Sequence, residues 1–251
     1  MKIAVYTTNY NGEVILKPFL KHYESFCHKI VIYDNGSNDN SEAIVKAHPF
    51  AQWIHFDDML EIVNISNTCW KDDIDYDYCI FVDNDEFLWV NGSMIEFLEQ
   101  KKKEGITVML PQGWTIADNH MPVEGVDWFE QYPRGFPFYA MDKPVIFNPT
   151  QIQRNAQAGG HIWNRDGKTW GSIPTGNVVW YKSKGDLKLL HFKQLSYDYW
   201  KERCKISLDR ITEAGAKALK QIGVGGYIAP YNETEKAGYN ASLDSLRRYD
   251  E

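Results

Sequence analysis

The chain has 251 residues, of which 43% are hydrophobic, and this is enough to bury one substantial core, or one domain with a smaller annex. Its formal net charge is −7 and its longest basic run is three lysines, so nucleic acid is not the expected main partner. No apolar stretch approaches the roughly 18 residues of a transmembrane helix. Four cysteines without metal-type spacing indicate reduced thiols, and the N-terminus is typical of a strand rather than a signal peptide, so a cytoplasmic location is expected.

The first sixty residues alternate between predicted strands and helices. Buried strands are expected at 3–8, 29–33 and 53–56, because each is a short apolar or β-branched run bounded by turn residues. Helical spacing predicts one helix that begins near Pro18, where a missing N–H is tolerated, and a second helix over 42–48. This order implies parallel strands joined by right-handed crossovers.

The apolar run 79–82 ends abruptly in Asp83, Asn84, Asp85 and Glu86. Such a run is typical of a strand buried on both faces, and ligands bind at the carboxyl end of such strands in open α/β sheets. In an extended backbone, Asp83 and Asp85 point to the same side, where two carboxylates favour Mg²⁺ or Mn²⁺ completed by phosphate oxygens. An acidic turn that faces water is the alternative interpretation.

Further elements surround this strand. A helix is expected near 62–70, before an acidic loop at 72–77. Ser93 and Glu96 form a capping box for a helix that ends in three lysines and Gly105, and a strand over 106–110 follows.

The amino-acid composition of the sequence changes at Pro111. Proline, glycine and aromatic residues are frequent to about residue 186, which predicts shorter strands and long loops. A helix is expected over 199–222, followed by a polar and loosely held tail over 227–251.

Taken together, the motifs resemble the nucleotide-sugar half of GT-A-fold glycosyltransferases, especially family 2. The resemblance rests on a first strand that ends near Asn11, a second that ends in the Asp34 turn, and the Asp83-Asn84-Asp85 run about fifty residues later. It covers about residues 1–210. Later motifs are similar to those of family 92 and related family 2-like bacterial enzymes: Asp85-Glu86-Phe87, Gly113-Trp114, Lys143-Pro144-Val145-Ile146, His161, Leu190-His191-Phe192, and Tyr199-Trp200 with Lys205.

This resemblance implies a GT-A fold, with a Rossmann-like, mostly parallel central sheet flanked by helices, an irregular acceptor-side half and a C-terminal helix. Residues 1–110 would form the nucleotide-sugar-binding half, 111–198 the acceptor-side half of the same domain, and 199–251 the C-terminal helix and tail. The implied activity is a metal-dependent, inverting transfer from a nucleoside-diphosphate sugar, with a UDP-sugar favoured, to a hydroxyl of a saccharide or glycolipid, as in polysaccharide biosynthesis.

The resemblance also implies particular site residues. Asp83, Asp85 and His191 are the expected ligands of Mn²⁺ or Mg²⁺, with His161 and Glu86 as further candidates. Donor contacts are expected at Thr7, Thr8, Asn11, Asp34, Asp83 and Asn84. Asp34 would accept a hydrogen bond from the nucleobase, and a turn residue that bonds its own backbone is the alternative. For each histidine, a packed or surface position is the alternative.

An inverting transfer needs a base that takes the proton of the acceptor. The loop from 113 to 130 offers several carboxylates, and Asp118, near a strand end, is preferred over Glu124, Asp127 and Glu130. Four tryptophans could either stack on sugar faces or pack in the core: Trp114, Trp128, Trp163 and Trp170.

Other classes of protein compete with this interpretation. A nucleotidyltransferase acting on sugar phosphates also uses metal-bound aspartates, but it normally has a basic, glycine-rich loop where this chain has residues 7–12. A dehydrogenase is disfavoured because no Gly-x-Gly-x-x-Gly follows the first strand. A non-catalytic carbohydrate-binding protein on the same fold would show neither hydrolysis nor transfer. Because such acceptors are often lipid-linked, the expected location includes peripheral contact with the inner face of a membrane. The oligomeric state stays open.

Overall fold

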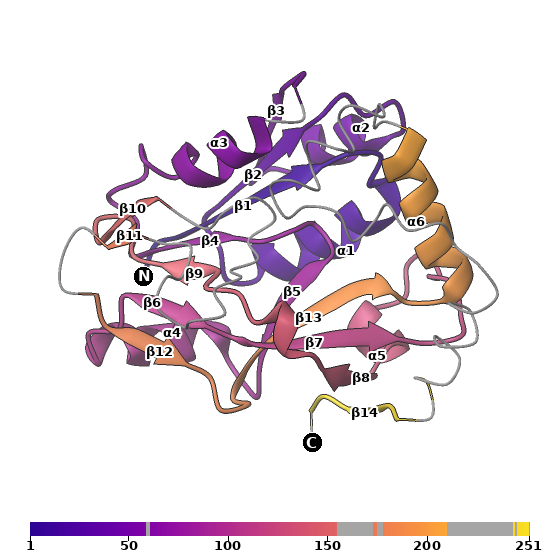
Figure 1. Cartoon of the computed structure of the whole chain (residues 1–251). Helices are drawn as coiled ribbons and strands as arrows, with labels where there is room; N and C mark the ends of the chain where they lie inside the picture. Colours follow the sequence, from indigo (N-terminus) through magenta and orange to yellow (C-terminus); the bar gives the residue numbers. More distant parts are fainter. Residues whose placement is uncertain (59–60, 155–172, 175–177, 210–242, 244, 251) are drawn as a thin grey trace.

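The computed structural model of the chain describes residues 1–58, 61–154, 173–174, 178–209, 243 and 245–250. Within them the fold is mixed α/β, with a mostly parallel central sheet and flanking helices, as the sequence predicted (Figure 1). The strands of this sheet, sheet A, are β1 (Ile3–Asn9), β2 (Lys29–Asp34), β3 (Ala51–His55), β4 (Tyr78–Phe81), β6 (Val108–Leu110), β9 (Ile146–Phe147) and β12 (Trp180–Lys182). Their order is β12-β6-β9-β4-β1-β2-β3. Among the described strands of this sheet, only β9 is antiparallel to its neighbours, and all other pairs are parallel.

A second sheet, sheet B, has the order β14-β8-β7-β13-β5. Its strands are β5 (Glu86–Val90), β7 (Gln112–Ala117), β8 (Arg134–Pro137), β13 (Leu187–Gln194) and β14 (Arg247–Arg248). Strand β13 lies parallel to β7 and antiparallel to β5. A short third sheet pairs β10 (Ile152–Arg154) with β11 (Ile173–Pro174). Sheet B therefore draws strands from both sides of the predicted division at residue 110, and that division stays a prediction.

Helices pack around the two sheets. They are α1 (Glu13–Glu24), α2 (Ser41–Lys46), α3 (Glu61–Thr68), α4 (Met94–Lys103), α5 (Trp128–Gln131), α6 (Tyr197–Asp209) and the 3₁₀ turn η1 (Tyr139–Met141). Figure 1 shows α6 crossing the end of the molecule toward which β1 and β13 run. The expected N-cap of α4 is confirmed, since Ser93 Oγ accepts a hydrogen bond from the Glu96 N–H at 3.3 Å. The reciprocal half of the capping box, from the Ser93 N–H to the Glu96 side chain, is not among the described hydrogen bonds.

The core lies on both faces of sheet A because side chains alternate along each strand. Ile3 and Val5 of β1 belong to the larger cluster, which α1 and sheet B complete, whereas Ala4 and Tyr6 belong to the cluster on the other face. The hydroxyl of Tyr23 on α1 donates to the Glu86 carbonyl at 2.9 Å, so α1 is also tied to β5.

The expected start of α1 near Pro18 is wrong, because the helix begins five residues earlier, at Glu13, with Pro18 inside it. Asp39 accepts from the Glu13 N–H at 3.0 Å, and Gly12 O accepts from the N–H groups of Ile15 and Leu16 at 2.9 Å. The contact with Asp39 and the local hydrogen bonds of this first turn therefore outweigh the one helical hydrogen bond that the proline cannot make.

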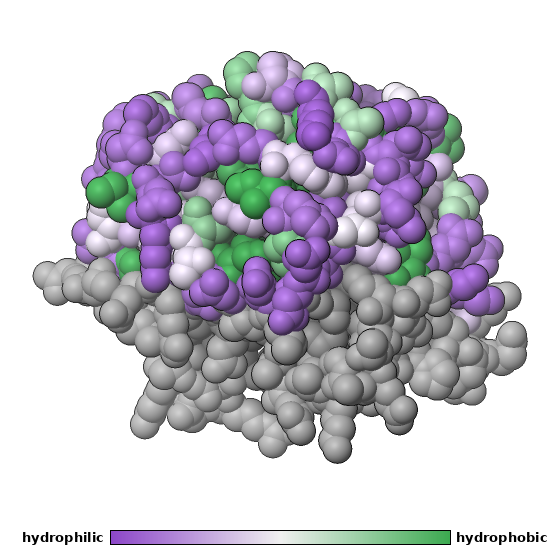
Figure 2. Space-filling view, turned by 90° about the horizontal axis from the view of Figure 1, so that it is seen from above, coloured by the Kyte–Doolittle hydropathy of each residue, from purple (hydrophilic) through white to green (hydrophobic). Residues whose placement is uncertain are grey.

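The face seen from above in Figure 2 is mostly hydrophilic, with apolar residues in small separate groups among the described residues. Within the described part of the chain, no helix combines the length and the apolar character required to cross a membrane.

Candidate donor and metal site

The acidic run connects the two sheets. The chain leaves sheet A after Phe81 and enters sheet B at Glu86, and the Glu86 N–H donates to the Asp83 carbonyl at 3.0 Å. The backbone of Asp83 and Asp85 therefore turns, and the expectation of an extended run with both carboxylates on one side is wrong. The physical reason is that the chain must change sheets within four residues.

Strand pairing brings His191 to this turn. In the antiparallel pair of β13 and β5, His191 lies opposite Glu86, and the Phe192 N–H donates to the Asp85 carbonyl at 2.8 Å. His191 Nε2 lies 3.4 Å from Asp85 Oδ1, with the two side chains only 10% and 20% exposed. Burial by itself raises the pKa of Asp85, but His191 and Lys193 outweigh it and hold that pKa well below its usual range. Asp85 is therefore a carboxylate, the form that a metal ligand requires.

A buried lysine lies on the other side of the turn. The Phe81 N–H donates to the Val145 carbonyl at 3.0 Å, and this pairing of β4 with β9 brings Lys143 to the acidic run. Lys143 Nζ lies 3.0 Å from Asp83 Oδ2 and also contacts Glu86 Oε1. Burial by itself lowers the pKa of Lys143, but the two carboxylates outweigh burial and raise it, so the ammonium stays charged.

Glu86 is a structural member of this cluster. Its side chain is 1% exposed, Oε1 contacts Lys143, and Oε2 accepts from the Asp83 N–H at 2.9 Å. Burial raises the pKa of Glu86, and Lys143 opposes this rise only in part. Both oxygens are thus used inside the turn, which argues against the predicted further role of Glu86 as a metal ligand.

The donor set of this turn fits a divalent ion in part. Adjacent ligands of an octahedral ion with bonds of about 2.1 Å lie about 3 Å apart, close to the 3.4 Å between His191 Nε2 and Asp85 Oδ1. Carboxylate and imidazole together suit Mn²⁺. Among the described residues no group of three or more His, Cys, Asp or Glu is arranged around a common metal position. An ion bound here would therefore take its remaining ligands from phosphate oxygens or water.

An amide network ties the turn to the strand ends of sheet A. Asn84 Nδ2 donates to Asn9 Oδ1 at 2.8 Å, and Asn9 Nδ2 donates to Asp34 Oδ1 at 3.0 Å. A Cβ atom on Gly12 would lie 2.1 Å from Asn9 Oδ1 and 2.9 Å from Asn84 Nδ2, so only glycine leaves room for this network.

Asp34 is 1% exposed and acts in its own turn. Its Oδ2 accepts from the Ser37 N–H at 2.8 Å, and its Oδ1 accepts from the Ser37 hydroxyl at 2.5 Å. This is the turn arrangement that the sequence left as the alternative, and contact of Asp34 with a nucleobase stays a prediction.

The remaining predicted donor residues lie at the end of β1. Thr7 is buried and Thr8 is half-buried, and neighbours along a strand face opposite sides of the sheet. Asn11 has a positive φ of 44°, its side chain accepts from the Asn38 N–H at 2.8 Å, and its carbonyl accepts from Arg203 Nη1 on α6 at 2.5 Å. Helix α6 is thereby attached to the loop after β1.

Asp118 lies just after β7. In the parallel pair of β7 and β13, Thr115 is opposite His191, so Asp118 lies about 10 Å further along the strand direction. Its Oδ1 accepts from the Asn119 N–H at 2.7 Å and contacts His120 Nδ1 at 2.5 Å, and its Oδ2 lies 4.0 Å from Arg134 Nη2. Asp118 is thus at the same end of the sheets as His191, and its role as a base stays a prediction.

Several other candidates have different positions. Trp114 and Trp128 are each 4% exposed and pack in the larger core cluster, which favours packing over sugar stacking. The Asp127 carboxylate caps α5 by accepting from the Phe129 N–H at 2.9 Å. His161, Trp163 and Trp170 lie outside the described residues.

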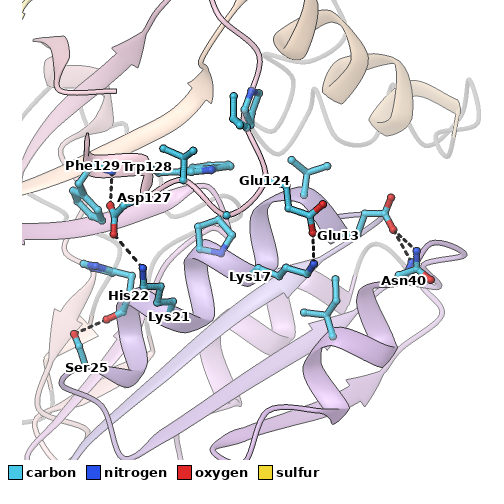
Figure 3. Close-up of a pocket in the computed structure, with 17 residues that line it drawn as sticks. Glu13, Lys17, Lys21, His22, Ser25, Asn40, Glu124, Asp127, Trp128 and Phe129 are labelled. Atoms are coloured by element: carbon cyan, nitrogen blue, oxygen red, sulfur yellow. Dashed lines mark hydrogen bonds and ion pairs between the residues drawn. The ribbon is translucent and has the colours of Figure 1, made fainter. Parts of the chain in front are cut away.

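A cavity of about 890 Å³ lies along α1, separate from the turn (Figure 3). One wall is α1 and the other is the loop 122–127, and two ion pairs join them: Lys17 to Glu124 at 2.6 Å and Lys21 to Asp127 at 3.4 Å. Neither Asp118 nor any described residue predicted for the donor or the metal lines it, whereas two of the less favoured base candidates, Glu124 and Asp127, do.

Sequence reasoning gave no role to Asn9, Lys143 or Arg203. Asn9 could have been found because it is a polar residue at the end of a buried strand. Asn11 and Asp34 were predicted as donor contacts from similar positions at strand ends. Lys143 entered only as part of a motif, because a lone lysine before a short strand carries no signal of burial. Arg203 is one charged residue among several on a helix, and nothing local distinguishes it.

No protein-family model and no curated protein sequence matches the chain. Among solved structures it is similar to S. aureus TarS crystallised with UDP, at 12% identity and a TM-score of 0.48, over 97% of this chain and 79% of that chain. It is also similar to Mycobacterium tuberculosis glucosyl-3-phosphoglycerate synthase with Mn²⁺, UDP and glucosyl-3-phosphoglycerate, at 15% identity and a TM-score of 0.31, over 45% of this chain and 44% of that chain. At such low scores these likenesses carry no argument about family or activity.

Proposed function

We propose that the chain is a metal-dependent glycosyltransferase of the GT-A type, which transfers a sugar from a nucleoside-diphosphate sugar, UDP-linked by preference, to a hydroxyl of a saccharide or glycolipid. The observation that carries this proposal is the close pair of Asp85 and His191 at the carboxyl end of the parallel sheet. A half-buried, ionised carboxylate beside an imidazole is a suitable pair of ligands for Mn²⁺ or Mg²⁺ with a bound diphosphate.

In this proposal each residue has a chemical role. Asp85 and His191 hold the metal ion, which when bound supplies positive charge to the diphosphate as the glycosidic bond breaks. Thr7, Thr8 and Asn11 line the nucleoside pocket. Asp118 takes the proton of the acceptor hydroxyl. The oxygen of that hydroxyl then bonds to the anomeric carbon while the nucleoside diphosphate leaves from the opposite side, and the configuration of that carbon is inverted.

The test is calorimetric titration of UDP, and then of GDP, with Mn²⁺ present or chelated. We expect wild-type UDP binding to require Mn²⁺, and Asp85→Asn and His191→Gln each to weaken it by at least about tenfold, because each removes a ligand. Glu104→Gln, at the exposed end of α4, is the control and should bind as the wild type does. Metal-independent binding, or no binding of either nucleotide, would refute the proposal. Tight binding without hydrolysis or transfer from any UDP-sugar would instead favour a carbohydrate-binding protein.

A further inference from the structure

Asp118 and His120 form a hydrogen-bonded pair in the loop that follows β7. His120 Nδ1 lies 2.5 Å from Asp118 Oδ1. An ionised carboxylate can only accept, so Nδ1 carries the proton and donates it, and in the neutral ring Nε2 keeps its lone pair. Nε2 has no partner among the described hydrogen bonds and ion pairs. The free end of this pair is therefore a nitrogen that can accept a proton.

The two side chains of the pair differ in exposure. The His120 side chain is 81% exposed, whereas that of Asp118 is 11% exposed. Asp118 Oδ1 also accepts from the backbone N–H groups of Asn119 and His120, at 2.7 and 3.1 Å, and Oδ2 lies 4.0 Å from Arg134 Nη2. The carboxylate is thus enclosed by contacts of its own loop and of β8. An acceptor that arrives from solvent reaches the imidazole before it reaches the carboxylate.

Two further contacts place His120 at the end of sheet B where the candidate site lies. The hydroxyl of the buried Tyr132 donates to the His120 carbonyl at 3.1 Å, and the Ser196 hydroxyl, just after β13, lies 3.3 Å from Met121 Sδ. The loop is therefore held beside the end of β13, the strand that carries His191. The pair begins about 10 Å beyond His191 along the strand direction. A sugar between a metal-bound diphosphate and an acceptor oxygen needs a span of this order, because each contact in that series is about 3 Å long.

We propose that His120 is the catalytic residue that takes the acceptor proton, and that Asp118 is a positioning residue that acts through it. The acceptor hydroxyl gives its proton to Nε2 and its oxygen bonds to the anomeric carbon, while the electron pair of the bond that breaks leaves with the nucleoside diphosphate. The resulting imidazolium keeps its contact with the Asp118 carboxylate, whose charge stabilises it. This inference rests on the proposed function and refines one step of it, namely which residue meets the hydroxyl.

The first test measures turnover. We expect His120→Ala to lower kcat for hydrolysis of a panel of UDP-sugars, with water as the acceptor, by about 100-fold, because a general base contributes roughly 10²–10⁴-fold. UDP affinity, from calorimetry with Mn²⁺, should stay as in the wild type. Added imidazole should restore part of the lost rate, since the exposed position leaves room for it. His48→Ala removes another histidine–carboxylate pair, with Glu24 at the far end of α1, and is the matched control.

The second test observes the ring itself. Long-range ¹H–¹⁵N NMR, with His120 assigned by its absence in His120→Ala, should show a neutral ring protonated at Nδ1 and bare at Nε2. Asp118→Asn should admit the opposite tautomer, because an amide can donate as well as accept, and should therefore lower kcat. The double variant should lose no more than His120→Ala alone, since the two residues act as one unit.

The outcomes separate this inference from the proposed function. Wild-type kcat in His120→Ala would overturn the role of His120 and leave the proposed function intact, with Asp118 as the direct base where Asp118→Asn loses activity. Losses that multiply in full in the double variant, or a neutral His120 ring protonated at Nε2, would also overturn it. Absence of hydrolysis and transfer from every UDP-sugar in the wild type would overturn the proposed function, and the role of His120 with it.

Discussion

At the scale of single residues, the candidate site depends on close contacts between short polar side chains. Asn9 lies between the turn of β2 and the acidic turn, and it accepts from Asn84 while it donates to Asp34. Such a network needs the space that Gly12 leaves, because a side chain at that position would overlap the Asn9 amide. The geometry of the site is therefore set by a residue that takes no part in its chemistry.

We predict that Gly12→Ala lowers the free energy of unfolding by about 1–3 kcal/mol, the usual cost of overpacking, and also weakens UDP binding. Thermal denaturation and calorimetric titration check the two effects. Gly105→Ala is the matched control, because Gly105 has a positive φ of 76° with no atom within 4 Å of an added Cβ. It should cost about 1 kcal/mol and leave UDP affinity unchanged. Wild-type UDP affinity in Gly12→Ala would contradict the role of the Asn84–Asn9–Asp34 hydrogen bonds in shaping the site.

At the scale of elements, the packing of α1 against sheet B explains how two sheets share one core. His22 of α1 lies 5.4 Å from the ring of Phe87 on β5 and 5.1 Å from the ring of Phe129 on α5, centroid to centroid. Its Nε2 atom is buried and has no hydrogen-bond partner in the described part of the chain. Burial lowers the pKa of His22 to about 4, although Asp127 acts in the opposite direction.

This pKa predicts acid sensitivity. Between the ordinary value of 6.5 and about 4, the unfolded chain binds a proton at His22 that the folded chain does not. The stabilisation is complete above pH 6.5 and is lost as the pH falls toward 4, by up to about 3 kcal/mol. We expect His22→Phe to lose less stability than the wild type between pH 7.5 and 4.5, as measured by urea denaturation. Equal losses in the two proteins would contradict a His22 that stays neutral in the folded chain.

At the scale of the whole molecule, Tyr249 attaches the described end of the chain to the core, so the expectation of a loosely held tail is wrong there, although the other residues of 245–250 are exposed or half-buried. Tyr249 is 3% exposed, its hydroxyl donates to the Phe129 carbonyl at 3.1 Å, and its carbonyl accepts from Lys188. Strand β14 extends sheet B beside β8. The mostly polar composition of the tail gave no sign that one of its aromatic residues, Tyr249, is buried.

We predict that Tyr249→Ala lowers the free energy of unfolding by about 3–5 kcal/mol, because it removes a large buried ring and a hydrogen bond. In a chain of this size that is a fall of about 10 °C in melting temperature. Asp250→Asn, whose ion pair with Arg248 is exposed, should cost less than about 1 kcal/mol. A melting temperature within about 2 °C of the wild type in Tyr249→Ala would show that the end of the chain is not part of the core.

Apart from β5, the sequence by itself determined the alternation of strands and helices in the first 110 residues, the mostly parallel sheet and the acidic run at its carboxyl end. These features are local, since hydrophobic period, turn residues and caps are contained within a few positions. The same local signals misplaced the start of α1, and they could not show that the acidic run turns into a second sheet.

Only the tertiary structure decided which distant residues share the site. Pairing of β13 with β5 brings His191 to Asp85, and pairing of β9 with β4 brings Lys143 within 3.0 Å of Asp83, sixty positions away in the chain. Many strands in such a chain have compatible apolar patterns, so pairing is selected by the packing of the whole core. Burial and charge then give each aspartate its environment, which identical residues two positions apart do not reveal in the sequence.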